Sequence, residues 1–305
     1  LLVLEALRCD YPWASDRLHA FVLQGMLDNR RGFARTPAFY YPYVEERISA
    51  GKGLIRALAE MASVVVTDDY PAFFLPRMTR AAAAKVAVRM EAVDSNTILP
   101  MTATDQVFNT AYSFRRYIQK HLPEHIEAFP RIDPFASATL PLMPELPREI
   151  TGSWPPAPEH LLKGDPARLA HMPLDHKVRV VEARGGAEAA QERLDAFVNR
   201  SLSIYHESRN HPDEMVCSGL SPYLHFGHIS PHRVLAAVME HEVWSPASLA
   251  QKASGQRAAW WGMREGAEAF LDQLITWGEL GFNLCLQRDD YDQLERLPHW
   301  DLHEL

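Results

Sequence analysis

The 305-residue sequence is poor in cysteine. Its three cysteines, Cys9, Cys217 and Cys285, are too widely spaced for a disulfide framework and form no zinc-ligand pattern. It also lacks any apolar run of transmembrane length and any stretch that resembles a signal peptide. We therefore expect a globular, monomeric protein of the reducing cytoplasm, with no membrane partner and no bound metal.

Basic charge is not in excess. The formal net charge is −8, and residues 201–305 hold 15 acidic side chains against 7 basic ones, whereas the first 200 residues hold 24 of each. Proteins that bind nucleic acid usually present a basic face. The composition alone therefore argues against DNA binding by these residues.

Several common site motifs are missing or incomplete. The sequence has no GxGxxG or GxxxxGK motif, so nothing in it marks a nucleotide phosphate site of those kinds. In HESRNH (206–211) the two histidines are five residues apart and do not share the helical face that a zinc protease needs. GLSPY (219–223) lacks the second glycine of a hydrolase nucleophile elbow. The sequence thus offers no credible nucleophile–base pair.

The first third of the chain alternates between two kinds of segment. Short apolar runs at 1–7, 38–44, 63–70 and 86–93 are separated by amphipathic segments that begin near Ser15, Gly53 and Phe73. This alternation predicts β-α-β crossovers on a parallel sheet. Ligands of such sheets lie at the carboxyl ends of strands, here TDDYP (67–71) and DSNTILP (94–100).

The rest of the chain changes character twice. Residues 121–185 are rich in proline and weakly periodic, which predicts a linker wrapped over the surface. From 186 the pattern is helical. We expect an α/β domain over 1–120, a linker over 121–185 and the first part of an all-α domain over 186–305. Because the chain starts inside an apparent strand, we also expect a piece of a longer protein that lacks both ends.

The stretch SGLSPYLHFGHISPHRV (218–234) contains two Ser-Pro pairs, and Ser before Pro favours the start of a helix. Small residues, Cys217-Ser218-Gly219, precede the first pair. Such an approach would let a phosphate reach free amides at a helix start. From these residues alone, two ordinary capped helices and an anion site both remain possible.

Three ordered segments carry a family resemblance. YHESRNHPDEMVCSGLSPYLHFGHISPHRV (205–234), EAFLDQLITWGELGFNLC (268–285) and DDYDQLERLPHW (289–300) resemble the DNA photolyase/cryptochrome family, most of all the class II cyclobutane pyrimidine dimer photolyases. LLVLEALRCDYPWASDRLHAFVLQGMLDN (1–29) and VVVTDDYPAFFLPRM (64–78) resemble the α/β domain of that family. The resemblance covers nearly the whole chain.

The resemblance implies a photolyase-type α/β antenna domain followed by a helical FAD-binding domain, and light-driven repair of pyrimidine dimers in DNA. An antenna chromophore is possible, but no motif specifies one. The missing end would supply most of the DNA-facing surface. The residues that match FAD contacts of the family are Tyr205, Cys217, Ser218, Gly219, Leu220, Ser221 and Asn283. Cys217 stands where relatives often have Thr, which would remove one hydroxyl donor.

Glu279 matches the glutamate that, in this family, hydrogen-bonds the damaged bases, and Trp277 could stack on a flipped-out dimer. To donate a hydrogen bond to developing negative charge, Glu279 must hold a proton. Gly278 departs from the family, which commonly has Arg there. Two alternatives stay open: a cryptochrome-like photosensor without repair activity, and an inactive truncated homologue.

Overall fold

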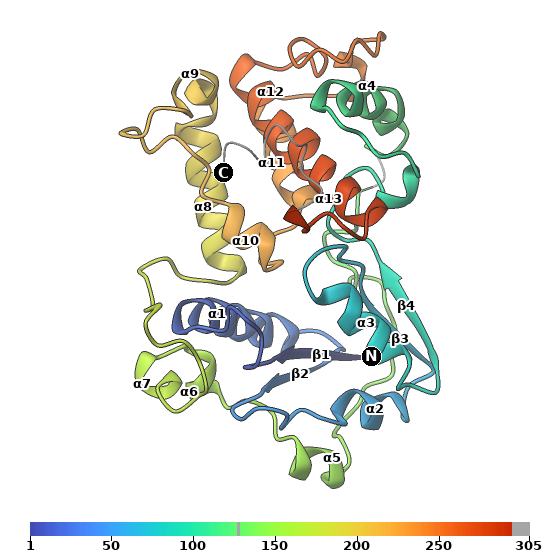
Figure 1. Ribbon diagram of the computed structural model, residues 1–305, viewed down its shortest axis with the longest axis vertical. Coiled ribbons are helices and arrows are strands. Elements are labelled where there is room, and N and C mark those ends of the chain that lie inside the picture. The colour runs from blue at the N-terminus through green and yellow to red at the C-terminus, as the bar shows by residue number, and fades with distance from the viewer. Residues whose placement is uncertain (127–128, 295–305) are drawn as a thin grey trace.

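The computed structural model describes residues 1–126 and 129–294. Figure 1 shows two bodies, one above the other. The lower body holds the strands with α1, α2, α3 and α5–α7, and the upper body holds α4 and α8–α13. The predicted fold class, a parallel-strand α/β part followed by a helical part, is confirmed.

The four predicted strands are present and parallel. β1 (Leu2–Leu7) pairs with β2 (Phe39–Val44), and β3 (Val64–Asp68) pairs with β4 (Arg89–Val93). Within the described residues the two pairs form separate two-stranded sheets, whereas the sequence predicted one sheet. The connecting helices are α1 (Asp16–Phe33), α2 (Leu54–Ala59) and α3 (Leu75–Ala83).

Helix α1 organises the lower body. It begins where the sequence predicts, because the Ser15 hydroxyl accepts a hydrogen bond from the Leu18 amide at 3.4 Å and caps the first turn. Leu23 and Met26 are fully buried against neighbouring elements. Spaced by three residues, they form one apolar face of the helix. The cluster around them includes residues of β1 and β2 and of the segment 157–172.

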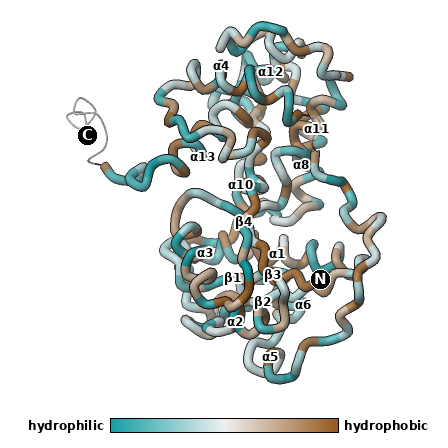
Figure 2. Tube along the Cα trace, turned by 90° about the vertical axis from the view of Figure 1, so that its right-hand side faces the viewer, coloured by the Kyte–Doolittle hydropathy of each residue, from teal (hydrophilic) through white to brown (hydrophobic). Residues whose placement is uncertain are grey.

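The segment 157–172 lies within the predicted surface linker (121–185), but it is part of the core. Residues 121–185 contain three short helices, α5 (Arg148–Ser153), α6 (Glu159–Leu162) and α7 (Pro166–Leu169). Leu162 and Leu169 are completely buried, so the segment completes the core of the α/β part. Helices of four to six residues are too short to show helical periodicity in a sequence. Residues 129–147 lead to α5 as an extended segment that descends one side of the molecule in Figure 2.

The upper body includes a helix from the predicted α/β domain (1–120). Phe114 of α4 (Ala111–His121) belongs to the same apolar cluster as Leu194, Phe197 and Phe270 of the later helices. The boundaries at 120 and 185 stay a prediction, but in this packing α4 joins the helical part. The other helices of this body are α8 (Ala187–Arg200), α9 (Tyr205–Ser208), α10 (Ser221–His225), α11 (Pro231–His241), α12 (Glu265–Leu271) and α13 (Gly278–Gln287).

Helices α12 and α13 form one continuous rod, as the sequence predicts for 265–287, but residues Asp272–Trp277 between them form a π-helical segment. A π-helical turn shifts the register of the side chains that follow it and often occurs at functional sites. In the described part of the chain, no helix combines the length and apolar character needed to cross a bilayer.

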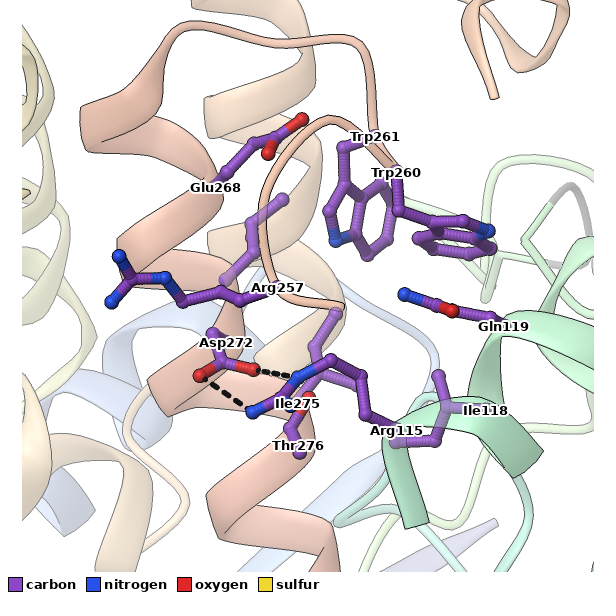
Figure 3. Close-up of a pocket in the computed structure, with 11 residues that line it drawn as sticks. Arg115, Ile118, Gln119, Arg257, Trp260, Trp261, Glu268, Asp272, Ile275 and Thr276 are labelled. Atoms are coloured by element: carbon purple, nitrogen blue, oxygen red, sulfur yellow. Dashed lines mark hydrogen bonds and ion pairs between the residues drawn. The ribbon is translucent and has the colours of Figure 1, made fainter. Parts of the chain in front are cut away.

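A buried ion pair fastens α4 to this rod. The Arg115 guanidinium donates to the Asp272 carboxylate with Nε–Oδ1 at 2.7 Å and Nη2–Oδ2 at 3.1 Å, as the dashed lines in Figure 3 show. Only 15% of the Arg115 side chain and 6% of the Asp272 side chain are exposed. Arg115 also donates to the Gly255 carbonyl at 3.1 Å, so its charge is well solvated by the protein.

Replacing Asp272 by Asn should lower the free energy of unfolding by about 3 kcal/mol, because removing one partner leaves the other charge buried without compensation. Urea unfolding monitored by circular dichroism measures this change. A matched control is Arg89→Gln, which breaks the exposed Arg89–Glu91 pair (79% and 42% exposed) and should change stability by less than about 0.5 kcal/mol. Equal effects of the two substitutions would contradict the prediction.

Candidate functional site

Glu279, in the first turn of α13, is 5% exposed and points into the upper body. Its Oε1 accepts hydrogen bonds from the backbone amides of Ile98 at 2.6 Å and Leu99 at 3.4 Å. These amides lie in the segment that follows β4, at the carboxyl end of the strands. The structure therefore joins the carboxylate predicted for catalysis to the strand end predicted to hold ligands.

The other carboxyl oxygen of Glu279 is different. Oε2 is buried, and no described residue offers it a hydrogen bond. The pKa of Glu279 is raised from 4.5 to about 8. Desolvation by burial is the largest cause; the Ile98 and Leu99 amides lower the pKa, and the nearby Asp94 carboxylate raises it. Two hydrogen bonds to a charged group contribute about 1.5–3 kcal/mol each. Burial of an ion costs several kcal/mol, so the neutral acid is favoured at pH 7.

Asn283 lies one turn further along the same face. Its Oδ1 accepts from the Phe108 amide at 3.3 Å, and its Nδ2 donates to the Gln106 carbonyl at 3.0 Å. Both ends of the carboxamide are thus engaged by the chain itself. Glu279 and Asn283 together line a cavity of about 10 Å³, which is room for about one water molecule.

The opposite face of this helix is open. Trp277 is 51% exposed, and Gly278 and Gly281 are exposed as well. A Cβ built on Gly278 would meet only the Gln273 carbonyl oxygen, at 3.8 Å. A longer side chain would therefore fit at position 278, and the glycine keeps this surface bare around Trp277.

The predicted phosphate-binding stretch forms a ledge on the surface. Cys217, Gly219 and Ser221 are exposed and Ser218 is half-buried, whereas Leu220 is 1% exposed and anchors the stretch in the core. Helix α10 begins at Ser221, but the residue in the capping position is Leu220, and no side-chain cap forms there. Only the second pair caps as the sequence predicts, with the Ser230 hydroxyl accepting from the Arg233 amide at 3.1 Å.

Tyr205 lies close to this ledge in sequence, but its ring is 8% exposed. It packs edge-on against Phe197 and Phe270, with ring centroids 5.6 Å apart in both pairs. Burial raises the pKa of its hydroxyl. The Arg209 guanidinium lies 5.9 Å from the ring centroid. In this structure Tyr205 therefore packs as a core residue.

Arg193 of α8 is a residue that sequence reasoning missed. Its guanidinium donates to the Ser218 carbonyl at 2.6 Å and the Cys217 carbonyl at 2.9 Å. No ion pair links it to a carboxylate within the described residues. A Cβ on Gly219, whose φ is +64°, would approach the Arg193 Nε to 2.7 Å, so glycine permits this contact. No sequence motif marks an arginine on a helix face, so Arg193 could not be predicted from the sequence.

The predicted residues therefore form two groups. Glu279 and Asn283 lie together on the inner face of α13, and Cys217–Ser221 lie together with Arg193. The second cavity, also about 10 Å³ and drawn in Figure 3, lies between α4 and the π-helical segment and includes the Arg115–Asp272 pair. None of the residues Tyr205 and Cys217–Ser221 lines either cavity.

The architecture defines a class: a two-part protein with a parallel-strand α/β body and a helical body. No protein-family model matches the chain. It is 29% identical over 303 residues to a deoxyribodipyrimidine photo-lyase from Methanothermobacter thermautotrophicus, a match that covers 98% of this chain and 58% of that protein. The chain therefore spans little more than half the length of that curated relative.

Solved structures show the same fold. A class III photolyase from Agrobacterium tumefaciens has a TM-score of 0.62 at 15% identity, covering 95% of this chain and 54% of its own. A Synechocystis cryptochrome has a TM-score of 0.60 at 14% identity, covering 94% and 56%. An archaeal photolyase from Sulfolobus tokodaii, solved with two FAD molecules, has a TM-score of 0.55 at 15% identity, covering 99% and 59%. Sequence and fold together relate the chain to the DNA photolyase/cryptochrome family; the class II subdivision stays a prediction.

The buried Glu279 carboxyl should make stability fall as pH rises. Its pKa is raised from 4.5 to about 8 in the folded chain, so folding takes up a proton between these values. The free energy of unfolding should decline from about pH 4.5 to about pH 8 and then level off. Glu279→Gln keeps an acceptor for Ile98 without an ionisable group, so it should lose this decline.

Urea unfolding at pH 5, 7 and 9 provides the measurement. The free energy of unfolding of Glu279→Gln, minus that of the original chain, should increase from pH 5 to pH 7 and again from pH 7 to pH 9. Glu192→Gln, an exposed glutamate on α8 with no ion pair among the described residues, controls for loss of one negative charge. Parallel pH profiles for the original chain and Glu279→Gln would contradict the assignment.

Proposed function

We propose that the protein containing these residues repairs cyclobutane pyrimidine dimers in DNA by light-driven electron transfer from reduced FAD, in the manner of a class II photolyase. The observation that carries the proposal is the neutral, buried Glu279 carboxyl with one unpaired oxygen. The similarity to a curated photolyase, which extends over 98% of the chain, also supports the proposal. A group that steadies developing negative charge must be a donor held in place before the reaction.

The ledge fits the diphosphate of FAD. The hydroxyls of Ser218 and Ser221 are its hydrogen-bond donors, and Ser221 is exposed. Arg193 adds a positive charge whose hydrogen-bond partners among the described residues are the Cys217 and Ser218 backbone carbonyls. Cys217 and Gly219 would contact the cofactor through their backbone, since the Cys217 thiol donates to the Arg209 carbonyl at 3.6 Å.

The flavin end of the site is less complete. Both described cavities are about 10 Å³, and a ligand pocket must cover most of its ligand's surface. We propose that Tyr205 and Leu220 back the cofactor from the core, and that Asn283 contacts it by exchanging its bonds to Phe108 and Gln106. An antenna chromophore stays unassigned, and a cytoplasmic location stays a prediction.

When bound, reduced FAD would supply the electron that splits the dimer in light and would recover it afterwards. Glu279 would hold a proton on Oε2 and donate a hydrogen bond to a carbonyl oxygen of the damaged bases. Oε1 would stay on the Ile98 and Leu99 amides, which fix the carboxyl's orientation. Trp277 lies on the opposite, exposed face of the helix, so in this arrangement it does not stack on bases that Glu279 contacts, and its stacking role stays a prediction.

Illumination of the full-length gene product with reduced FAD and a dimer-containing oligonucleotide should restore intact thymines, and darkness should not. Glu279→Ala should slow repair by about 100-fold, since loss of one donor to developing charge costs that much or more, while flavin stays bound. Chromatography of the oligonucleotide measures repair. Stoichiometric flavin with no light-dependent repair would support the photosensor alternative, and no flavin binding would support the inactive homologue.

Arg193→Gln should weaken flavin binding to the same gene product by about 10-fold or more, because a charge-assisted contact to phosphate is lost. Equilibrium dialysis with FAD, followed by absorbance, gives the dissociation constant. The control is Arg184→Gln, which removes a cation from the exposed Arg184–Glu188 pair on a nearby segment and should leave binding unchanged. Equal loss in both variants would indicate a general charge effect.

A further inference from the structure

Three side chains on one face of α13 bind a single segment of backbone. Glu279, Asn283 and Gln287 are spaced by four residues, so they lie in one row along the helix. Glu279 accepts from the Ile98 and Leu99 amides, Asn283 bonds Gln106 and Phe108, and the Gln287 amide donates to the Thr104 carbonyl at 3.0 Å. This row of contacts extends over most of the loop 94–108.

The other end of this loop is fixed to the α/β body. The Asp94 carboxylate, just after β4, accepts from the Thr97 hydroxyl at 2.6 Å and the Met101 amide at 2.8 Å. Ser95 donates to the Asp68 carboxylate at the end of β3, at 2.7 Å. Asn96 donates to the Asp69 carbonyl at 3.0 Å. The loop 94–108 is therefore attached at one end to the strands and along its length to α13.

We infer that the loop 94–108 and the Glu279–Asn283–Gln287 row form a joint between the two bodies, closed while Glu279 is protonated and opened when that proton is lost. In the closed joint the carboxyl accepts two amide bonds and is neutral. Loss of the proton leaves a charge on a group whose second oxygen is buried without a partner among the described residues. Release of the Ile98–Leu99 segment admits water and relieves that cost.

The Ile98 and Leu99 amides stabilise an ionised Glu279 in the closed joint, but burial and the Asp94 charge outweigh them, since the pKa of Glu279 is raised to about 8. Asp94, on the loop itself, is the charged group that acts on Glu279, and its negative charge opposes ionisation of the closed joint. On α4, Arg115 is paired with Asp272 of the π-helical segment. On α11, the His232 imidazole interacts with Asp94, and burial lowers the pKa of His232, which favours its neutral form. On α13 itself the neighbours in the row, Asn283 and Gln287, are neutral.

Backbone hydrogen–deuterium exchange tests the joint without light, flavin or DNA. After correction for the intrinsic pH dependence of exchange, protection of the Ile98 and Leu99 amides should fall at least 10-fold between pH 6 and pH 9. Glu279→Gln should keep that protection at both pH values, and Glu279→Ala should lack it at both. The Gly51 amide, which donates to the Glu45 carboxylate at 3.0 Å in the α/β body, is the internal control and should not change.

Gln287→Ala provides a second variant outside the proposed catalytic group. Loss of one neutral hydrogen bond from the row should speed exchange at Ile98 and Leu99 about 5-fold at pH 6, the effect of a typical bond, if the row acts as one unit. Protection that is independent of pH in the original chain, or that falls equally in Glu279→Gln, would overturn the inference. Because no activity is measured, these outcomes are separate from success or failure of the repair assay.

Discussion

The burial of one carboxyl group is the constraint on which the interior of the helical body depends. Glu279 is placed where water cannot solvate it, and two backbone amides satisfy only one of its oxygens. The balance of desolvation against these bonds keeps the group neutral. A neutral acid is both an acceptor and a donor, so one side chain can hold the loop with one oxygen and leave a proton on the other.

The same residue can therefore be structural and functional without conflict. A carboxyl group with only a structural role would hold the loop more strongly if both of its oxygens accepted hydrogen bonds. A carboxyl group that only bound a ligand would need no hydrogen bonds from the loop amides. The divided use of the two oxygens explains why the helix carries Asn283 and Gln287 on the same face. These neutral side chains hold the loop in place where Glu279 alone would hold it at only one point.

Sequence reasoning identified features that depend on local pattern. Ser15 caps α1 and Ser230 caps α11, because a cap needs only neighbours in the chain. It failed where distant residues decide: Leu162 and Leu169 turn an apparent linker into core, and Leu220 takes the capping position expected of Ser221. The resemblance drew attention to Glu279, but its partners are backbone amides 180 residues away, which no side-chain pattern can mark.

Helix α12, the π-helical segment and α13 form one rod that carries all of these contacts. The Arg115–Asp272 ion pair lies at the start of the π-helical segment, and the contacts with the loop 94–108 come from α13. The π-helical turn changes the direction in which the following side chains point. The rod can therefore present Asp272 to α4 and Glu279 to the loop 94–108, while Trp277 between them faces outward. A regular α-helix would place Asp272 and Glu279, seven residues apart, on one face, and the π-helical turn lets the two carboxyl groups reach different partners.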